Sequence, residues 1–162
     1  MKRRMFVAGF AFAVLAVVAV LGLVGPAAAA EQLPFGGKLQ GDVSLTPAPP
    51  LLLEDIEAMG TATRLGHFML DVRLVVDPAT RTAVGVYEFT AANGDTLYAE
   101  FTGQATPTEI PGVLYIEESA IITGGTGRFA GATGNFIAKR WSDPIVGTTV
   151  GYFEGTISAP GS

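Results

Sequence analysis

After residue 30, the chain consists of short runs in which apolar and more polar residues alternate, with turn-forming residues between the runs. The apolar positions of the clearest run are Phe68, Leu70, Val72, Leu74 and Val76. Successive side chains of a β-strand point to opposite faces, so a period of two indicates strands with one buried face. A helical period is absent from these runs, and the sequence therefore predicts an all-β domain over residues 31–162.

Turn signals divide this domain into seven or eight strands. Asn93-Gly94 tolerates the positive φ angles of a tight hairpin turn, and Asp77-Pro78 also favours a turn. Besides 68–76, strands are expected from Ala58 onward and at Gly37–Leu45, Arg81–Thr90, Thr96–Thr106, Val113–Thr123, Thr133–Trp141 and Val146–Ser158.

Three segments do not fit the strand pattern. Glu31–Phe35 is expected to be a short lead-in, and Leu51–Glu57 an irregular stretch or a single helical turn. Thr46–Pro50 contains three prolines, which cannot donate hydrogen bonds in the interior of a sheet.

Strands joined mostly by short turns form an antiparallel meander, whose two edges could recruit other chains. Closure into a barrel removes both edges. We therefore expect a small closed antiparallel β-barrel of about eight strands, in which Leu39–Leu45 pairs with Val150–Ile157. A two-sheet β-sandwich is the alternative.

The first thirty residues have the composition of a signal peptide, which is expected to form a helix. Lys2, Arg3 and Arg4 precede an apolar run, and Gly25-Pro26 and small residues follow it. We expect cleavage after Ala30 and a secreted or otherwise extracytoplasmic location. The apolar run is also just long enough to cross a bilayer, so an uncleaved membrane anchor is the alternative.

Composition excludes several classes of protein. The chain has no cysteine, which rules out a disulfide scaffold, a thiol nucleophile and a zinc–cysteine site. Removing residues 1–30, which hold three basic residues and no acidic ones, changes the formal net charge from −5 to −8. Such an acidic surface repels phosphate and argues against binding to nucleic acid.

The stretch Thr123–Gly134 is rich in glycine but lacks the features of a phosphate site. Gly127 is followed by Arg128-Phe129, whereas a P-loop has Gly-Lys-Ser/Thr, and the glycine spacing also departs from the dinucleotide-binding pattern. The stretch is better interpreted as a compact connection between strands that places Phe129 in one end of the barrel.

This stretch, Gly-Gly-Thr-Gly-Arg-Phe-Ala-Gly-Ala-Thr-Gly between two strands, resembles the corresponding turn of allene oxide cyclase-like and dirigent-like proteins and of their secreted bacterial relatives. The resemblance is good over Ile121–Phe136 and loose elsewhere. It implies an eight-stranded barrel with an apolar cavity, and in some members an enzyme, often a dimer or trimer, that guides a reactive intermediate to one stereoisomer. Their catalytic positions have no identifiable counterparts in this chain.

Glu118 and Arg140 are the candidate ligand-binding residues. Each shares its strand face with apolar residues and so points inward, and a connection near Gly127–Ala130 would place them roughly opposite each other. We predict an internal ion pair that orients a polar ligand group or acts as acid and base. The alternative is a cross-strand pair near the barrel mouth without a ligand.

The other candidates favour structural roles. His67, the one histidine, lies among polar neighbours and is expected at the surface or rim, without the further ligands that a metal needs. The inward or outward direction of Glu88 is undecided, because both faces of its strand are apolar. Trp141 is expected to pack at the rim.

Together these observations favour a secreted barrel, without a cofactor or metal, that binds a small apolar or amphipathic molecule. The alternatives are an isomerase or cyclase that works by confining its substrate, and an extracellular interaction or structural module that forms homo-oligomers. An open interior would favour a ligand, and a filled one would favour the module. Contact with a membrane is expected only through an uncleaved signal segment.

Overall fold

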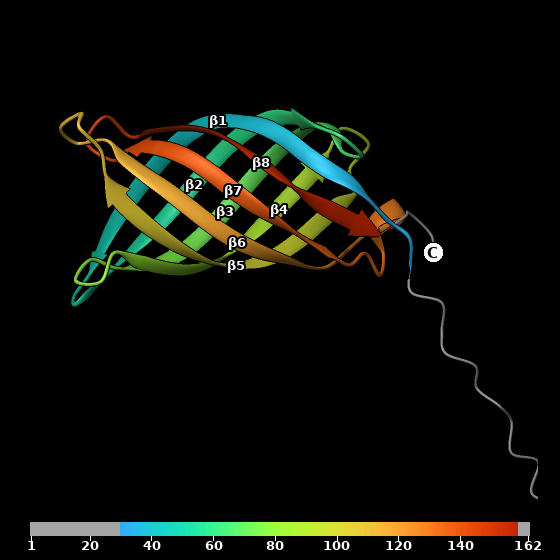
Figure 1. The fold of residues 1–162 in the computed structure, drawn as a ribbon, viewed down its shortest axis with the longest axis horizontal. Helices are drawn as coiled ribbons and strands as arrows, with labels where there is room; N and C mark the ends of the chain where they lie inside the picture. Colours follow the sequence, from blue (N-terminus) through green and yellow to red (C-terminus); the bar gives the residue numbers. More distant parts are fainter. Residues whose placement is uncertain (1–29, 159–162) are drawn as a thin grey trace, which may run out of the picture.

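The computed structural model of this protein describes residues 30–158, so the predicted signal peptide lies outside the described residues. Eight antiparallel strands close into one barrel in chain order, which confirms the predicted fold and excludes the sandwich (Figure 1). The strands are β1 (Gln32–Ala48), β2 (Leu51–Ala62), β3 (Gly66–Asp77), β4 (Thr82–Ala91), β5 (Thr96–Pro107), β6 (Leu114–Gly125), β7 (Gly134–Asp143) and β8 (Thr148–Ser158), with a short 3₁₀ helix, η1 (Gly127–Phe129), before β7.

β1 and β8 close the barrel, as predicted, but over a different stretch of β1. Gln32 pairs with Ser158, and the pairing continues to Asp42 opposite Thr148. The interpretation of 31–35 as a lead-in was wrong, since Phe35 is 1% exposed and lies in the core. Pro34 and the two glycines that follow Phe35 obscured the alternation.

The first hairpin also differs from the prediction. Residues 51–57 are not irregular but form the first half of β2, and β1 continues through Pro47 to Ala48. β1 pairs with β8 only as far as Asp42, so its last residues have a partner strand on one side alone. Pro47 is tolerated there because its missing N–H faces no second strand.

Aromatic rings fill the middle of the barrel. Each ring has a neighbour in contact, with centroids 4.7–6.2 Å apart. All are at most 4% exposed: Phe35, Phe68, Tyr87, Phe89, Phe101, Phe136 and Phe153. This part of the interior is therefore a packed core that leaves little room for a ligand.

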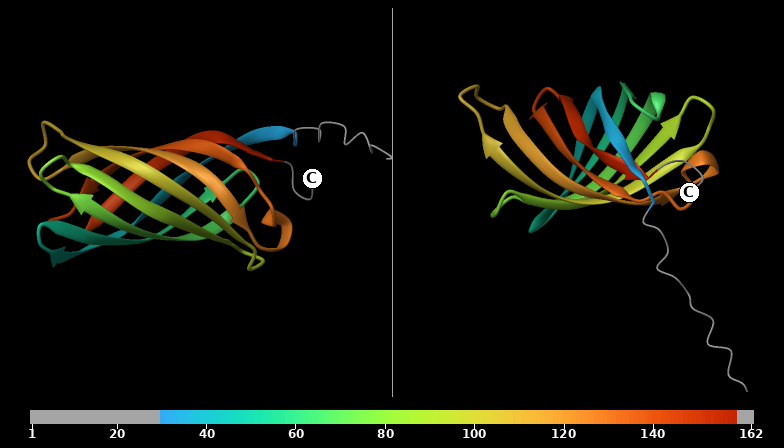
Figure 2. Two further views of the ribbon diagram at one scale, coloured as in Figure 1. Left: turned by 90° about the horizontal axis from the view of Figure 1, so that it is seen from below. Right: turned by 45° about the vertical axis from the view of Figure 1, so that its right-hand side comes forward.

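The two ends of the barrel differ. Both ends of the described chain, the turns 63–65 and 92–95, and η1 lie at one end, which we call the terminal end (Figures 1 and 2). Leu65 and Phe129 are buried there, as predicted for Phe129. The other four loops, at 49–50, 78–81, 108–113 and 144–147, form the opposite end, which we call the hairpin end.

The predicted turns are present. β4 and β5 are joined by a four-residue connection in which Gly94 has a φ of 87°. Asp77 accepts a hydrogen bond from the backbone N–H of Ala79 at 2.9 Å in the next predicted turn. Within residues 30–158, no helix is both long and apolar enough to cross a membrane.

Candidate functional site

A cluster of polar side chains lies inside the barrel, between the aromatic core and the hairpin end. Its members are Glu54 of β2, Tyr87 of β4, Glu118 of β6 and Arg140 of β7. Glu118 is 0%, Tyr87 1%, Arg140 2% and Glu54 8% exposed. Burying charged groups costs much free energy unless they are paired, so the partners of each group determine what the cluster can do.

The predicted pair of Glu118 and Arg140 is formed. Arg140 donates from Nη2 to Glu118 Oε1 at 2.7 Å and from Nε to Oε2 at 3.0 Å, a bidentate contact. The register places Ala138 directly opposite Glu118, so Arg140 reaches Glu118 along the diagonal. The outward neighbours of this pair are directly opposite each other, and Lys139 Nζ lies 3.8 Å from Glu117 Oε2.

Glycines on the neighbouring strands make room for these two side chains. A Cβ atom at Gly103, opposite Glu118, would lie 2.9 Å from Glu118 Cγ. A Cβ at Gly151, opposite Arg140, would lie 2.6 Å from Arg140 Cβ. The ion pair therefore occupies space that larger residues on β5 and β8 would take.

Tyr87 is a third member that the sequence analysis did not identify. Its hydroxyl donates a short hydrogen bond to Glu118 Oε2, so both oxygens of Glu118 are occupied. The flanking Val84 and Val86 are exposed, and Glu88 points to solvent. The two faces of β4 are about equally apolar, so only the pairing with the neighbouring strands decides which one turns inward.

Glu54 is the fourth member, and its Oε1 atom has no hydrogen-bond partner. The atom lies 3.7 Å from Arg140 Nη2, which is too long for a hydrogen bond. Leu52, Glu54 and Ile56 alternate with outward residues in β2. The sequence analysis did not identify Glu54, because a carboxylate at an inward position interrupts the apolar alternation by which a strand is recognised.

Burial of the cluster shifts the pKa values of Glu54, Tyr87 and Arg140. Burial raises the pKa of Glu54 above its usual value, and the positive charge of Arg140 opposes that shift. Burial likewise raises the pKa of Tyr87 well above the ordinary value of 10.0, with a further contribution from Glu118. Burial lowers the pKa of Arg140, but the charge and hydrogen bonds of Glu118, together with the charges of Tyr87 and Glu54, outweigh burial, so the net shift is upward.

Arg140 retains hydrogen-bonding capacity beyond its contact with Glu118. A guanidinium has five N–H groups, and Nη1 makes only one long contact, 3.4 Å, to the hydroxyl of Thr149. The Thr149 hydroxyl in turn donates to the carbonyl oxygen of Trp141 at 3.1 Å. Arg140 can thus donate to a further acceptor, and Glu54 Oε1 can accept from a further donor.

The cluster is nearest the hairpin end, where the interior is less well covered. Leu45 lies directly opposite Glu54, faces the same side of the sheet and is 40% exposed. Other inward-facing residues towards this end are partly exposed, among them Leu52, Val76, Ala83, Ala105 and Leu114. The hairpin end therefore combines an accessible apolar wall with a polar floor.

The structure also bears on the predictions for His67, Trp141 and the glycine-rich turn. His67 and Trp141 are exposed on the outer face. In the glycine-rich turn, the backbone N–H of Arg128 donates to Asp95 Oδ2 at 3.3 Å. A carboxylate already lies where an anion would have to bind, which agrees with the structural interpretation of this turn.

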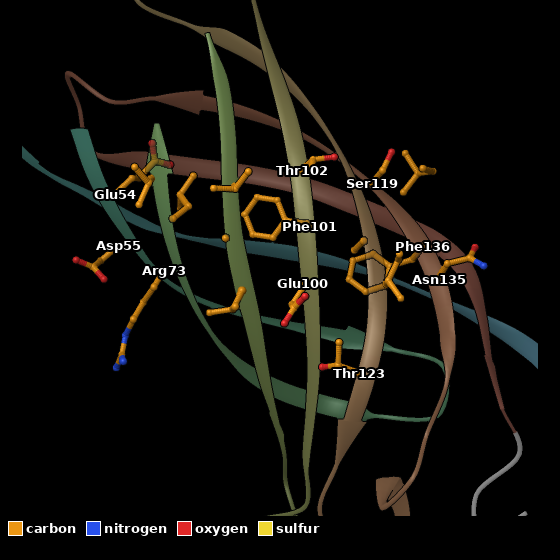
Figure 3. Close-up of a pocket in the computed structure, with 18 of the residues that line it drawn as sticks. Glu54, Asp55, Arg73, Glu100, Phe101, Thr102, Ser119, Thr123, Asn135 and Phe136 are labelled. Carbon is orange, nitrogen blue, oxygen red and sulfur yellow. The ribbon is translucent and has the colours of Figure 1, made fainter. Parts of the chain in front are cut away.

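An open groove of about 1040 Å³ crosses the outer face from β2 to β7 (Figure 3). Asp55, Arg73 and Glu100 line it and are labelled in the figure. Its exposed apolar residues are Leu53, Val84, Val86, Ile121 and Ile137, which are 39–65% exposed.

No family model, curated protein or solved structure matches this chain. The resemblance of the glycine-rich turn to allene oxide cyclase-like proteins therefore stays a prediction. Among residues 30–158, no three His, Cys, Asp or Glu side chains gather in a way that could hold a metal ion.

Proposed function

We propose that this protein is an extracytoplasmic barrel that binds one small amphipathic molecule at its hairpin end. The apolar part of the molecule lies against Leu45 and its partly exposed neighbours, and its polar group meets Glu54 and Arg140. The observation that carries this proposal is the buried Glu54 Oε1, which lacks a hydrogen-bond partner beside an arginine with N–H groups to spare.

The partners of each residue assign different roles within the cluster. Glu118 is fully buried and both its oxygens are engaged, so it holds Arg140 in place and does not touch the ligand. Glu54 accepts a hydrogen bond from a hydroxyl or amine of the ligand. Arg140 donates to a neighbouring oxygen. This narrows the sequence-based hypothesis, in which Glu118 itself met the ligand or acted as acid and base.

The filled middle of the barrel limits the size of the ligand. Aromatic rings occupy the space that an enclosed substrate would need, which makes a confining cyclase less favourable than a binding protein. The ligand is therefore expected to sit at the mouth rather than to thread through the interior.

Native mass spectrometry of the protein purified from its own host tests this proposal. The wild-type chain should carry a small-molecule adduct. Leu45→Glu should lose it, because a charge then faces the apolar wall. Leu53→Glu is the matched control, since Leu53 is 41% exposed but faces outward. A wild-type protein without an adduct, or loss in the Leu53 variant alone, would contradict the proposal.

A second candidate function is an interaction module that uses the outer groove. The filled middle of the barrel favours this module by the criterion given in the sequence analysis. The exposed apolar residues of β2, β4, β6 and β7 in this groove favour it, because side chains of this kind gain little from facing water. The same pair of variants separates the two: a partner bound in the groove is lost with Leu53→Glu and retained with Leu45→Glu.

A further inference from the structure

The one histidine of the chain and both methionines of the described residues lie in a second outer groove, on neighbouring strands. Met59 of β2 and Met69 of β3 are directly opposite each other, and His67 is two residues from Met69 on the same face. The groove has a volume of about 720 Å³ and also includes parts of β1, β4 and β8.

The two methionines bury too little of their apolar side chains to explain their position. Each is 55% exposed, although the interior of the barrel has many apolar positions. Burial of the side chain is what makes an apolar residue stabilising, so half-exposed thioethers contribute little to folding. Their proximity to each other and to the histidine needs a different explanation.

We propose that Met59, Met69 and His67 form a binding site for Cu(I). Thioethers are soft ligands that select Cu(I), and a neutral imidazole is also a good ligand for copper. Directly opposite residues of an antiparallel pair have Cβ atoms about 5 Å apart, and residues two apart on a strand are separated by about 7 Å. The three rotatable bonds of methionine allow both sulfur atoms and the imidazole to converge on one ion.

A row of carboxylates next to this site would attract the cation. Asp42, Glu57, Asp71 and Glu88 follow one another across β1 to β4, each directly opposite the next. Like charges in directly opposite positions destabilise a sheet, so this row opposes folding, but it concentrates cations near the groove. The hard carboxylates do not select Cu(I) and are not proposed as its ligands.

The opposing charge in the groove is Lys38 of β1. It is the one Lys, Arg, Asp or Glu residue among those that line the groove. Lys38 lies opposite Thr61, which in turn lies opposite His67. The ammonium group of Lys38 thus lies on β1, which β2 separates from β3. The acidic row, by contrast, lies directly beside the two methionines.

The test is an anaerobic titration of the purified full chain with Cu(I), in competition with a coloured Cu(I) chelator. One ion should bind per chain. Met59→Leu, Met69→Leu and His67→Gln should each weaken binding by more than the roughly 10–100-fold that is lost when a residue that only supports a metal ligand is replaced. Gln40→Leu is the matched control, because Gln40 lines the same groove, lies opposite Met59 and has no soft donor.

The methyl resonances of the methionines provide a second measurement. Addition of Ag(I), a redox-inert substitute for Cu(I), should shift the signals of Met59 and Met69 together. Leucine retains the size of methionine at these exposed positions, so the variants should keep the circular dichroism of the wild type. Binding that survives in the Met59→Leu/Met69→Leu double variant, or no binding by the wild type, would overturn the proposal.

Discussion

At the scale of single residues, the buried cluster makes stability depend on charge pairing. Arg140→Met would leave the carboxylate of Glu118 buried and without its cation. We expect a loss of about 3–5 kcal/mol in the free energy of unfolding, the cost of breaking a buried pair. Tyr87→Phe removes one hydrogen bond to the same carboxylate and should cost less, about 1.5–3 kcal/mol.

Urea denaturation at neutral pH measures both free energies of unfolding. We expect Arg140→Met to be less stable than Tyr87→Phe. Equal stability of Arg140→Met and the wild type would show that the ion pair contributes no more than the apolar side chain that replaces it.

Glu54 should make the protein less stable as the pH rises. Burial raises its pKa in the folded state, so between the unfolded value, near 4.5, and the folded value the native chain binds more protons than the unfolded chain. Stability is therefore highest below the unfolded pKa and falls as the pH rises through the folded pKa. Glu54→Gln should remove this part of the pH dependence.

The same substitution should raise stability at pH 7 by about 1 kcal/mol, because a neutral amide costs less to bury than a carboxylate whose charged form burial disfavours. Thermal unfolding of both proteins between pH 4 and pH 8 gives the comparison. Glu100→Gln is the control, because Glu100 is an exposed, outward residue of β5 with apolar residues opposite it on both neighbouring strands. If Glu54→Gln is less stable than the wild type at pH 7, the attraction between Glu54 and Arg140 outweighs the cost of burying the carboxylate, and the expected pH dependence is wrong.

At the scale of the elements, η1 and its flanking glycines close the terminal end. Phe129 is 1% exposed, and its truncation to alanine should cost about 3–5 kcal/mol. The neighbouring Arg128 lies over the Phe129 ring, with its guanidinium carbon 4.8 Å from the ring centroid, and is 39% exposed in its side chain. Arg128→Ala should therefore cost less than about 1 kcal/mol.

Chemical denaturation of the two variants checks this difference. A comparable loss in both would contradict this expectation and mean that Arg128 stabilises the turn about as much as the buried ring does. The hydrogen bond from Arg128 Nη2 to the carbonyl of Leu65, 3.1 Å long, is the contact through which that could happen.

The strands that the sequence predicts correctly are those with an unbroken alternation. β3 is the clearest case, because its inward residues are all apolar. β2 was only half identified, since Glu54 occupies an inward position there, and the start of β1 was missed because Pro34 and two glycines flank Phe35. A buried carboxylate in β2, and a proline and two glycines in β1, thus break the alternation by which strands are recognised.

The candidate site, like the set of strands, could be predicted only in part from the sequence. Glu118 and Arg140 follow from the strand period and one hairpin, which are local features. Tyr87 and Glu54 reach the cluster from strands that are not neighbours of β6 and β7, so their approach depends on closure of the barrel. A sequence pattern specifies which face a residue takes, but it does not specify which side chains meet across the interior.

At the scale of the whole molecule, the barrel has one sealed end and one accessible end. Phe129 and Leu65 cover the aromatic core at the terminal end, and partly exposed apolar residues surround the polar cluster at the hairpin end. The two outer grooves lie on the outer face of the sheet and are separate from the cluster inside the barrel. The buried polar cluster thus lies near the end of the barrel at which inward-facing apolar residues are partly exposed.

The most direct test is a crystal structure of the protein purified from its own host with the co-purified molecule bound. We expect that molecule at the hairpin end, against Leu45, with a polar atom within hydrogen-bond distance of Glu54 Oε1 and another near Arg140. A molecule bound in an outer groove, or Glu54 Oε1 hydrogen-bonded within the protein while the hairpin end stays empty, would contradict the account.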